Sequence, residues 1–77
     1  MYYYLGYYEK FDKCNHVRII AQGCKQDKEE LKEVAYASNV KYSKESYPKY
    51  SQREYRVIEA HDKSEAMNVL SNIAKEN

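Results

Sequence analysis

The chain has 77 residues, with no tryptophan, one phenylalanine, one proline and only two glycines. So few glycines leave no glycine-rich loop of the kind that cradles phosphates. Cys14, His16, Cys24 and His61 could in principle bind zinc, but they form no CxxC or HxxxH pair. If residues 16–22 are extended at about 3.3 Å per residue, Cys14 and Cys24 lie too far apart to share a metal or a disulfide. We therefore expect no metal, no cofactor and free thiols.

Neither sign of charge dominates, because 13 basic and 12 acidic residues give a formal net charge of +1. This balance excludes an acidic mimic of DNA. It also differs from most nucleic-acid binders, whose affinity comes largely from a basic excess. No apolar run approaches the roughly 18 to 20 residues of a membrane span, and the N-terminal pattern is not that of a signal peptide. These patterns predict a cytoplasmic protein that does not enter a membrane.

Catalytic patterns are equally scarce. Cys14 or Cys24 could act as a nucleophile with His16 or His61, but no motif supplies a third, orienting group or an oxyanion site. His61 also precedes a helix cap, where a polar turn residue is expected. We therefore expect a protein that is not an enzyme.

Aliphatic residues are few, whereas tyrosine is abundant. Leucine, isoleucine, valine and phenylalanine total 13 residues, but there are ten tyrosines, five of them within the first eight positions. With balanced charge, this composition predicts one small folded domain over residues 1–77 with an aromatic-rich core. A small core cannot hold ten tyrosines, so some should form a binding surface.

A faint repeat suggests two halves, residues 1–39 and 40–77. Residues 16–21 (HVRIIA) resemble residues 55–60 (YRVIEA), and each run precedes a helix-capping signal. Asp27 and Asp62 are the expected caps, each followed three residues later by a glutamate. The two segments indicate a possible ββα pseudo-repeat.

The element pattern predicts an α+β domain of order ββαββα, in which both helices pack on one face of a small antiparallel sheet. Residues 2–8 and 16–22 form the expected hairpin, residues 40–43 a short strand and residues 54–60 the last strand. The first helix should end near Asn39. The second carries an apolar stripe that should pack its Val69, Leu70 and Ile73 against Val17, Ile19 and Val57.

Strand alternation then assigns the faces. Val17, Ile19 and Ala21 should point toward the helices, together with the odd-numbered residues of the first strand. The opposite, open face becomes a predicted platform of tyrosine and arginine. A one-residue slip in register would exchange the two sets of tyrosines. The platform residues are Tyr2, Tyr4, Tyr8, Arg18 and Arg56.

A second predicted binding element is an exposed loop at residues 44–52. Tyrosines around Pro48, between basic residues, resemble the composition of binding loops more than that of structural turns. A plain solvated loop is the alternative interpretation. The binding residues expected here are Tyr47, Lys49, Tyr50 and, just after the loop, Arg53.

Residues 55–66 (YRVIEAHDKSEA) resemble a strand-to-helix step that is common in small phage-encoded accessory proteins. The Lys-, Tyr- and Asn-rich composition resembles theirs as well. The similarity covers about a sixth of the chain. It implies host takeover or counter-defence through binding and blocking a host factor, and it transfers no functional residue.

The leading hypothesis is a protein-binding module, in the form of a phage-type inhibitor of a host protein. The alternative is a nucleic-acid or nucleotide binder that stacks bases on the tyrosines and meets phosphates with nearby lysines and arginines. A third interpretation is a structural subunit that acts through self-association, for example as a homodimer.

Overall fold

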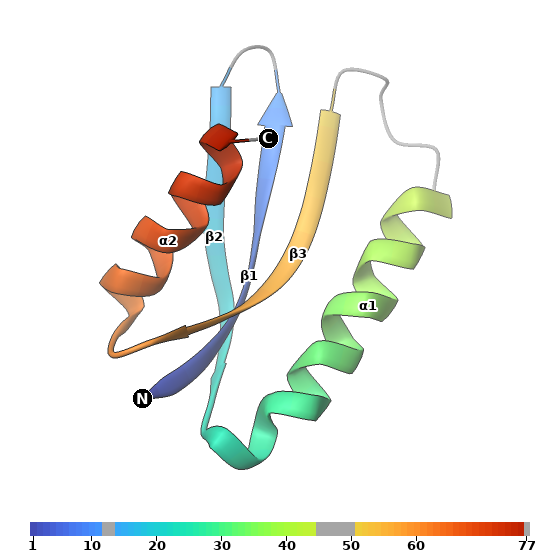
Figure 1. Ribbon diagram of the computed structural model, residues 1–77. Coiled ribbons are helices and arrows are strands. Elements are labelled where there is room, and N and C mark those ends of the chain that lie inside the picture. The colour runs from blue at the N-terminus through green and yellow to red at the C-terminus, as the bar shows by residue number, and fades with distance from the viewer. Residues whose placement is uncertain (12–13, 45–50, 77) are drawn as a thin grey trace.

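The computed structural model describes residues 1–11, 14–44 and 51–76, without the side chains of residues 11, 42–44, 51 and 52. The chain forms two strands, a helix, a third strand and a second helix (Figure 1). These elements are β1 (Tyr2–Phe11), β2 (Cys14–Gly23), the short 3-10 turn η1 (Lys25–Asp27), α1 (Lys28–Lys44), β3 (Ser51–Ala60) and α2 (Lys63–Glu76). The predicted α+β class is confirmed, in the order ββαβα.

The three strands form one antiparallel sheet in the order β2-β1-β3. β1 and β2 are the predicted hairpin, and Tyr8 lies opposite Val17. On the other side, the same residue lies opposite Glu54 of β3. The first strand of the sequence is therefore the middle strand of the sheet.

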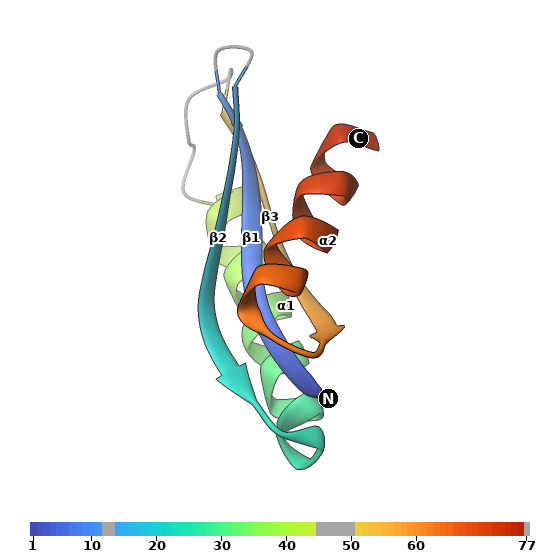
Figure 2. The same cartoon turned by 90° about the vertical axis from the view of Figure 1, so that its left-hand side faces the viewer.

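The two helices lie on opposite faces of this sheet, so the prediction that both pack on one face is wrong. Figure 2 shows α2 standing off one side of the sheet and α1 behind the strands. Leu70 of α2 packs with Tyr4 and Tyr8, whereas Leu31 of α1 packs with Tyr3 and Leu5. β1 carries apolar side chains at both its odd-numbered and its even-numbered positions, and so on both faces. Both of its faces must therefore be covered, as in strands that lie between two layers.

A bulge in the hairpin explains a second difference in face assignment. Leu5 pairs with Ala21, but the next residue, Gly6, pairs with Ile19, so Ile20 is the extra residue on β2. One extra residue moves the side chains beyond it to the opposite face of the sheet. Ile19 therefore packs with the α2 cluster, as predicted, while Ala21 packs with the α1 cluster.

Packing on α2 follows the predicted stripe with one exception. Leu70 is fully buried, and the half-buried Val69 and Ile73 pack against the same cluster as Val17 and Ile19. Val57, predicted to lie there too, packs with Leu5 and Leu31 on the α1 face. The bulge at Ile20 explains this difference too. Val57 lies opposite Leu5 and shares its face, whereas the bulge puts Val17 and Ile19 on the other face.

Asp62 forms the predicted cap, whereas Asp27, the other predicted cap, is the third residue of η1, whose N-cap is Cys24. The backbone N–H of Glu65 donates to Asp62 Oδ1 at 2.8 Å, which caps α2. Asp27 Oδ2 accepts a hydrogen bond of 2.8 Å from the backbone N–H of Cys24 and closes η1 directly before α1. Each β-strand of the faint repeat therefore leads through a capped turn into a helix.

Within the described residues, the second half of the repeat has no first strand of its own. Residues 40–43, predicted as a strand, continue α1 to Lys44, so the boundary at residue 40 falls inside a helix. β3 begins at Ser51 rather than Glu54. Of the predicted loop at residues 44–52, Lys44 belongs to α1, residues 51 and 52 belong to β3, and 45–50 lie outside the described residues.

Candidate binding surface

The predicted platform does not form, because its central tyrosines are core residues. Tyr4 and Tyr8 are 2% and 5% exposed beneath α2. Burial, and then the hydrogen bond from its hydroxyl to Glu54, raises the pKa of Tyr8. Tyr2 stays exposed at the start of β1, with its ring edge-on to that of Tyr4 at 6.5 Å.

The two predicted platform arginines lie on opposite faces. Arg56 shares the α2 face with Glu54 and is paired with it, at 3.0 Å between Nη2 and Oε1. Arg18 lies on the other face. The predicted loop residues Tyr47, Lys49 and Tyr50 lie outside the described residues.

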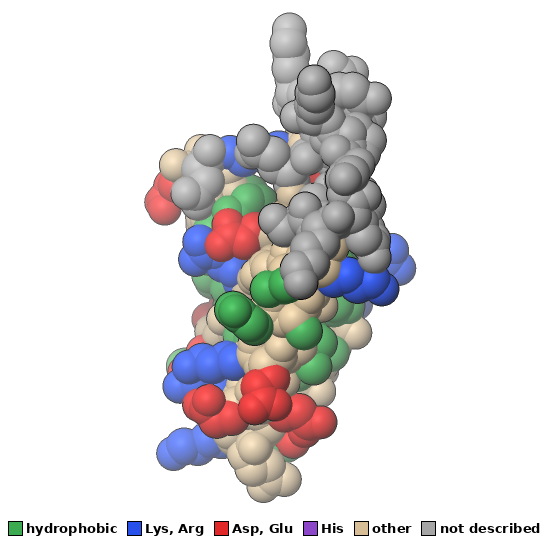
Figure 3. All heavy atoms as spheres, turned by 90° about the vertical axis from the view of Figure 1, so that its right-hand side faces the viewer, with side chains coloured by type: hydrophobic (Ala, Val, Ile, Leu, Met, Phe, Trp, Pro, Cys, Tyr) green, Lys and Arg blue, Asp and Glu red, His purple; other side chains and the backbone are tan. Residues whose placement is uncertain are grey.

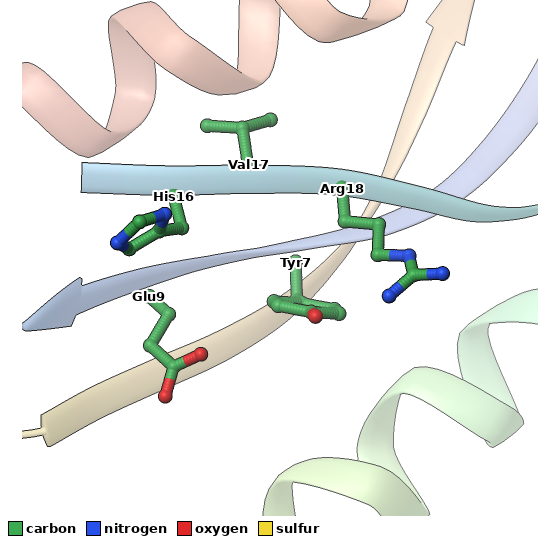
Figure 4. Close-up of a pocket in the computed structure, with 5 residues that line it drawn as sticks. All are labelled: Tyr7, Glu9, His16, Val17 and Arg18. Atoms are coloured by element: carbon green, nitrogen blue, oxygen red, sulfur yellow. The ribbon is translucent and has the colours of Figure 1, made fainter.

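An open region nevertheless exists, on the α1 side of the sheet. α1 runs along β3 and leaves the β2 side of that face uncovered (Figure 1). Figure 4 shows Tyr7, Glu9, His16 and Arg18 projecting to this side from β1 and β2, while Val17 points toward α2. These five residues line a shallow hollow of about 480 Å³, which we call the β2 depression.

One wall of the β2 depression is held by contacts from β3. The guanidinium of Arg53 lies over the Tyr7 ring, 4.3 Å from its centroid, and Arg53 Nη2 donates to Glu9 Oε2 at 2.9 Å. Arg53 Nη1 also donates to the Tyr55 hydroxyl at 3.2 Å, and the rings of Tyr7 and Tyr55 lie 5.2 Å apart. This network fixes the orientation of Tyr7.

Arg53 is thus a structural cation of the site. Burial by itself lowers the pKa of Arg53, but the hydrogen bonds to Tyr55 and Glu9 outweigh it and raise the pKa above its ordinary value. The guanidinium keeps its charge and its place over Tyr7. A ligand that stacked on this face of Tyr7 would first have to displace it.

Arg18 differs from Arg53 and Arg56. It is exposed, and no side chain among the described residues forms a hydrogen bond or an ion pair with it. His16, its neighbour two positions earlier on the same face, is exposed as well. The β2 depression therefore presents an exposed guanidinium and an exposed imidazole beside a fixed aromatic ring.

Sequence reasoning identified Arg18 and Arg53 but missed Tyr7, Glu9 and His16. The register slip considered above could have found Tyr7 and Glu9, because it moves the odd-numbered residues of β1 to the open face. His16 could have been found from Arg18, because the two residues are two positions apart in β2 and share a face. Another missed residue is Tyr36 on α1, which is 73% exposed. Seen from the α1 side, hydrophobic side chains show at mid-height among uncharged atoms, with charged side chains above and below them (Figure 3).

The described residues hold no group of three or more His, Cys, Asp or Glu side chains placed to bind a metal. Cys14 and Cys24 are exposed free thiols. Neither α1 nor α2, the two described helices, has the length and apolar character to cross a membrane. The β2 depression combines one carboxylate that is paired to Arg53 with one histidine, an arrangement suited to recognition by charge and shape.

Comparisons of the chain with protein-family models, with curated proteins and with solved structures gave no match. The resemblance to phage accessory proteins therefore stays a hypothesis.

Proposed function

We propose that this domain is a non-enzymatic protein-binding module whose contact surface is the β2 depression. The observation that carries the proposal is the exposed Arg18, which has no ion-pair partner among the described residues and lies beside Tyr7 on a sheet face that α1 leaves open. Arginine and tyrosine are two of the three residue types that dominate the energetics of protein interfaces.

Preorganisation supports the same proposal. Tyr7 is already fixed by Arg53 and Tyr55, so little side-chain entropy is lost when a partner packs against it. Arg18 loses water on binding and gains a hydrogen-bonded anionic partner, an exchange that is favourable only when the partner supplies complementary groups. The surface should therefore be selective for a complementary partner.

The same contacts disfavour the nucleic-acid alternative. Single-strand readers need open aromatic faces on which bases stack. Here Arg53 covers one face of Tyr7, and of the three predicted platform tyrosines Tyr4 and Tyr8 are buried, while Tyr2 stays exposed at the start of β1. Arg18 alone would neutralise few phosphates.

A matched pair of variants tests the proposal. Arg18→Gln and Lys75→Gln each remove one exposed positive charge, and Lys75 lies in the last turn of α2, on another element. Each immobilised variant is used to capture partners from lysate after nuclease treatment, and circular dichroism checks that both are folded. We expect Arg18→Gln to weaken capture of a specific protein about tenfold or more, and Lys75→Gln to leave it unchanged.

Two results would count against the proposal. Equal capture by both variants would remove the β2 depression as the contact surface. Loss of capture on nuclease treatment, with an affinity that falls steeply as salt is raised, would instead support the nucleic-acid alternative.

A further inference from the structure

We infer that the outer edge of β2 accepts an extended segment of a partner protein as a fourth strand, with apolar and acidic side chains alternating along that segment. The inference rests on the proposed function, which it deepens by naming the kind of partner. Strand addition of this type obtains its affinity from main-chain hydrogen bonds and its specificity from alternate side chains.

The two edges of the sheet differ in how their backbone groups are used. At the β3 edge, Asn39 of α1 binds the main chain of Tyr55 twice: its Nδ2 donates to the Tyr55 carbonyl at 3.1 Å, and its Oδ1 accepts from the Tyr55 N–H at 2.7 Å. A side-chain amide thus occupies the positions that another strand would use. Covering an edge in this way is a usual protection against unwanted pairing.

β2 has no such cover within the described part of the chain. It pairs with β1 on one side, and no hydrogen bond from a described side chain reaches its outer main chain. α1 packs at the far side of the sheet, beside β3. The bulge at Ile20 limits regular pairing, because a bulge kinks an edge. Residues 15–19 remain as a short regular stretch that a segment of similar length can meet.

The side chains of this stretch specify what should lie beside them. Arg18 and His16 point to the open face and have no partner among the described residues, so acidic side chains fit there. Val17 and Ile19 point to the α2 face and pack, half-buried, against the cluster around Leu70, so apolar side chains fit there. Because side chains alternate along a strand, one extended segment meets both demands only if its acidic and apolar residues alternate.

Synthetic peptides test this directly on the intact domain. The probe is an acetylated and amidated heptapeptide of alternating valine and glutamate, and the first control replaces every glutamate with lysine. The second control is a pair of peptides that keep the glutamates: one is methylated on the backbone nitrogens of one edge, and the other on those of the opposite edge, so each lacks about half of its main-chain donors. Binding is followed through amide chemical shifts in NMR titrations.

We expect the glutamate peptide to shift amides of residues 15–19, with an affinity at least tenfold higher than that of the lysine peptide. The methylated peptide that faces β2 with its blocked edge should lose binding, and Arg18→Gln, but not Lys75→Gln, should weaken the glutamate peptide. Equal binding of the methylated peptides would overturn strand addition. So would no shift with the glutamate peptide at millimolar concentration, or shifts centred on β3 and α1.

The two proposals can fail separately. If Arg18→Gln loses the captured partner while backbone methylation of the peptide has no effect, the β2 depression is the interface but strand addition is wrong. If the peptide binds as expected while Arg18→Gln captures its partner normally, the outer edge of β2 can accept a strand, but the proposed function of the β2 depression is wrong.

Discussion

The two helices cover the two faces of this small sheet to different extents. On the α2 face, the helix lies across the strands, and tyrosines, Ala60 and Leu70 form a closed cluster. On the α1 face, the helix packs along β3 and β1, and the β2 side stays open. Tyrosines of β1 therefore have opposite roles at neighbouring positions. Tyr8 is core, and Tyr7 is part of the proposed contact surface.

This difference shows that the role of a tyrosine here is set by strand parity and helix placement. Tyr7 and Tyr8 have the same side chain and lie in the same strand, yet one meets α2 and the other meets Arg53. The closed face should dominate stability, and the open face should dominate binding. Perturbing each face in turn should reveal this division.

The largest expected effect is on the closed face. Leu70→Ala removes a fully buried side chain and should lower the free energy of unfolding by about 2 to 5 kcal/mol. Leu31→Ala, the matching change on the α1 face, should cost less, because Leu31 belongs to a smaller cluster and retains some exposure. Urea unfolding followed by circular dichroism measures both.

A domain of this size has only about 3 to 5 kcal/mol to lose, so Leu70→Ala is best measured with a stabilising osmolyte present for all proteins. An equal or greater loss in Leu31→Ala would contradict the ranking of the two faces.

An intermediate effect is expected where the closed face meets the bulge. A Cβ at Gly6 would lie 2.6 Å from the Arg18 carbonyl oxygen and 2.9 Å from Leu70 Cδ2. The carbonyl belongs to the paired strand and cannot move alone, so Gly6→Ala should cost about 1 to 3 kcal/mol. Ile20→Ala, at the exposed bulge residue, should change stability by about 0.5 kcal/mol or less. If both changes lowered the free energy of unfolding by similar amounts, the loss would come from the bulge itself and not from the close contacts at Gly6.

The smallest effect should appear only at alkaline pH. Burial raises the pKa of both Tyr4 and Tyr8, so these groups hold their protons more tightly when folded. Their contribution to stability is complete below the unfolded pKa of about 10 and is lost as pH rises through the higher folded pKa. The melting temperature should fall above about pH 10, and less steeply in Tyr8→Phe than in the native protein. Tyr36→Phe, at an exposed helix position, serves as the control and should follow the native curve.

Local features of the fold were predictable from the sequence. The Asp62 cap, the stripe through Leu70 and the hairpin of β1 and β2 depend on short-range patterns, and the structure confirms all three. The wrong assignments depended on longer-range facts. Residues 40–43 look like a short strand in isolation, but helix α1 extends through them.

The site was harder to predict for a specific physical reason. Choosing between Tyr7 and Tyr8 required knowing that the helices take opposite faces, which follows from the packing of the whole chain. The bulge at Ile20 then separates Ile19 from Ala21, although their spacing in the sequence suggests a shared face. Arg18 was identified because it alternates with Val17 and Ile19, and the structure keeps this short-range alternation.

The central position of β1 also has a consequence for the order of folding. Its hairpin with β2 closes over a short stretch of chain, but its other edge pairs Tyr2 with Ala60, about three quarters of the chain length away. Closing so long a loop carries an entropic cost before any contact compensates for it, which slows folding. During synthesis, one edge of β1 therefore stays unpaired until β3 has left the ribosome. A nascent chain stalled before residue 60 should therefore expose the unpaired edge of β1, to which other chains can pair unless a chaperone covers it.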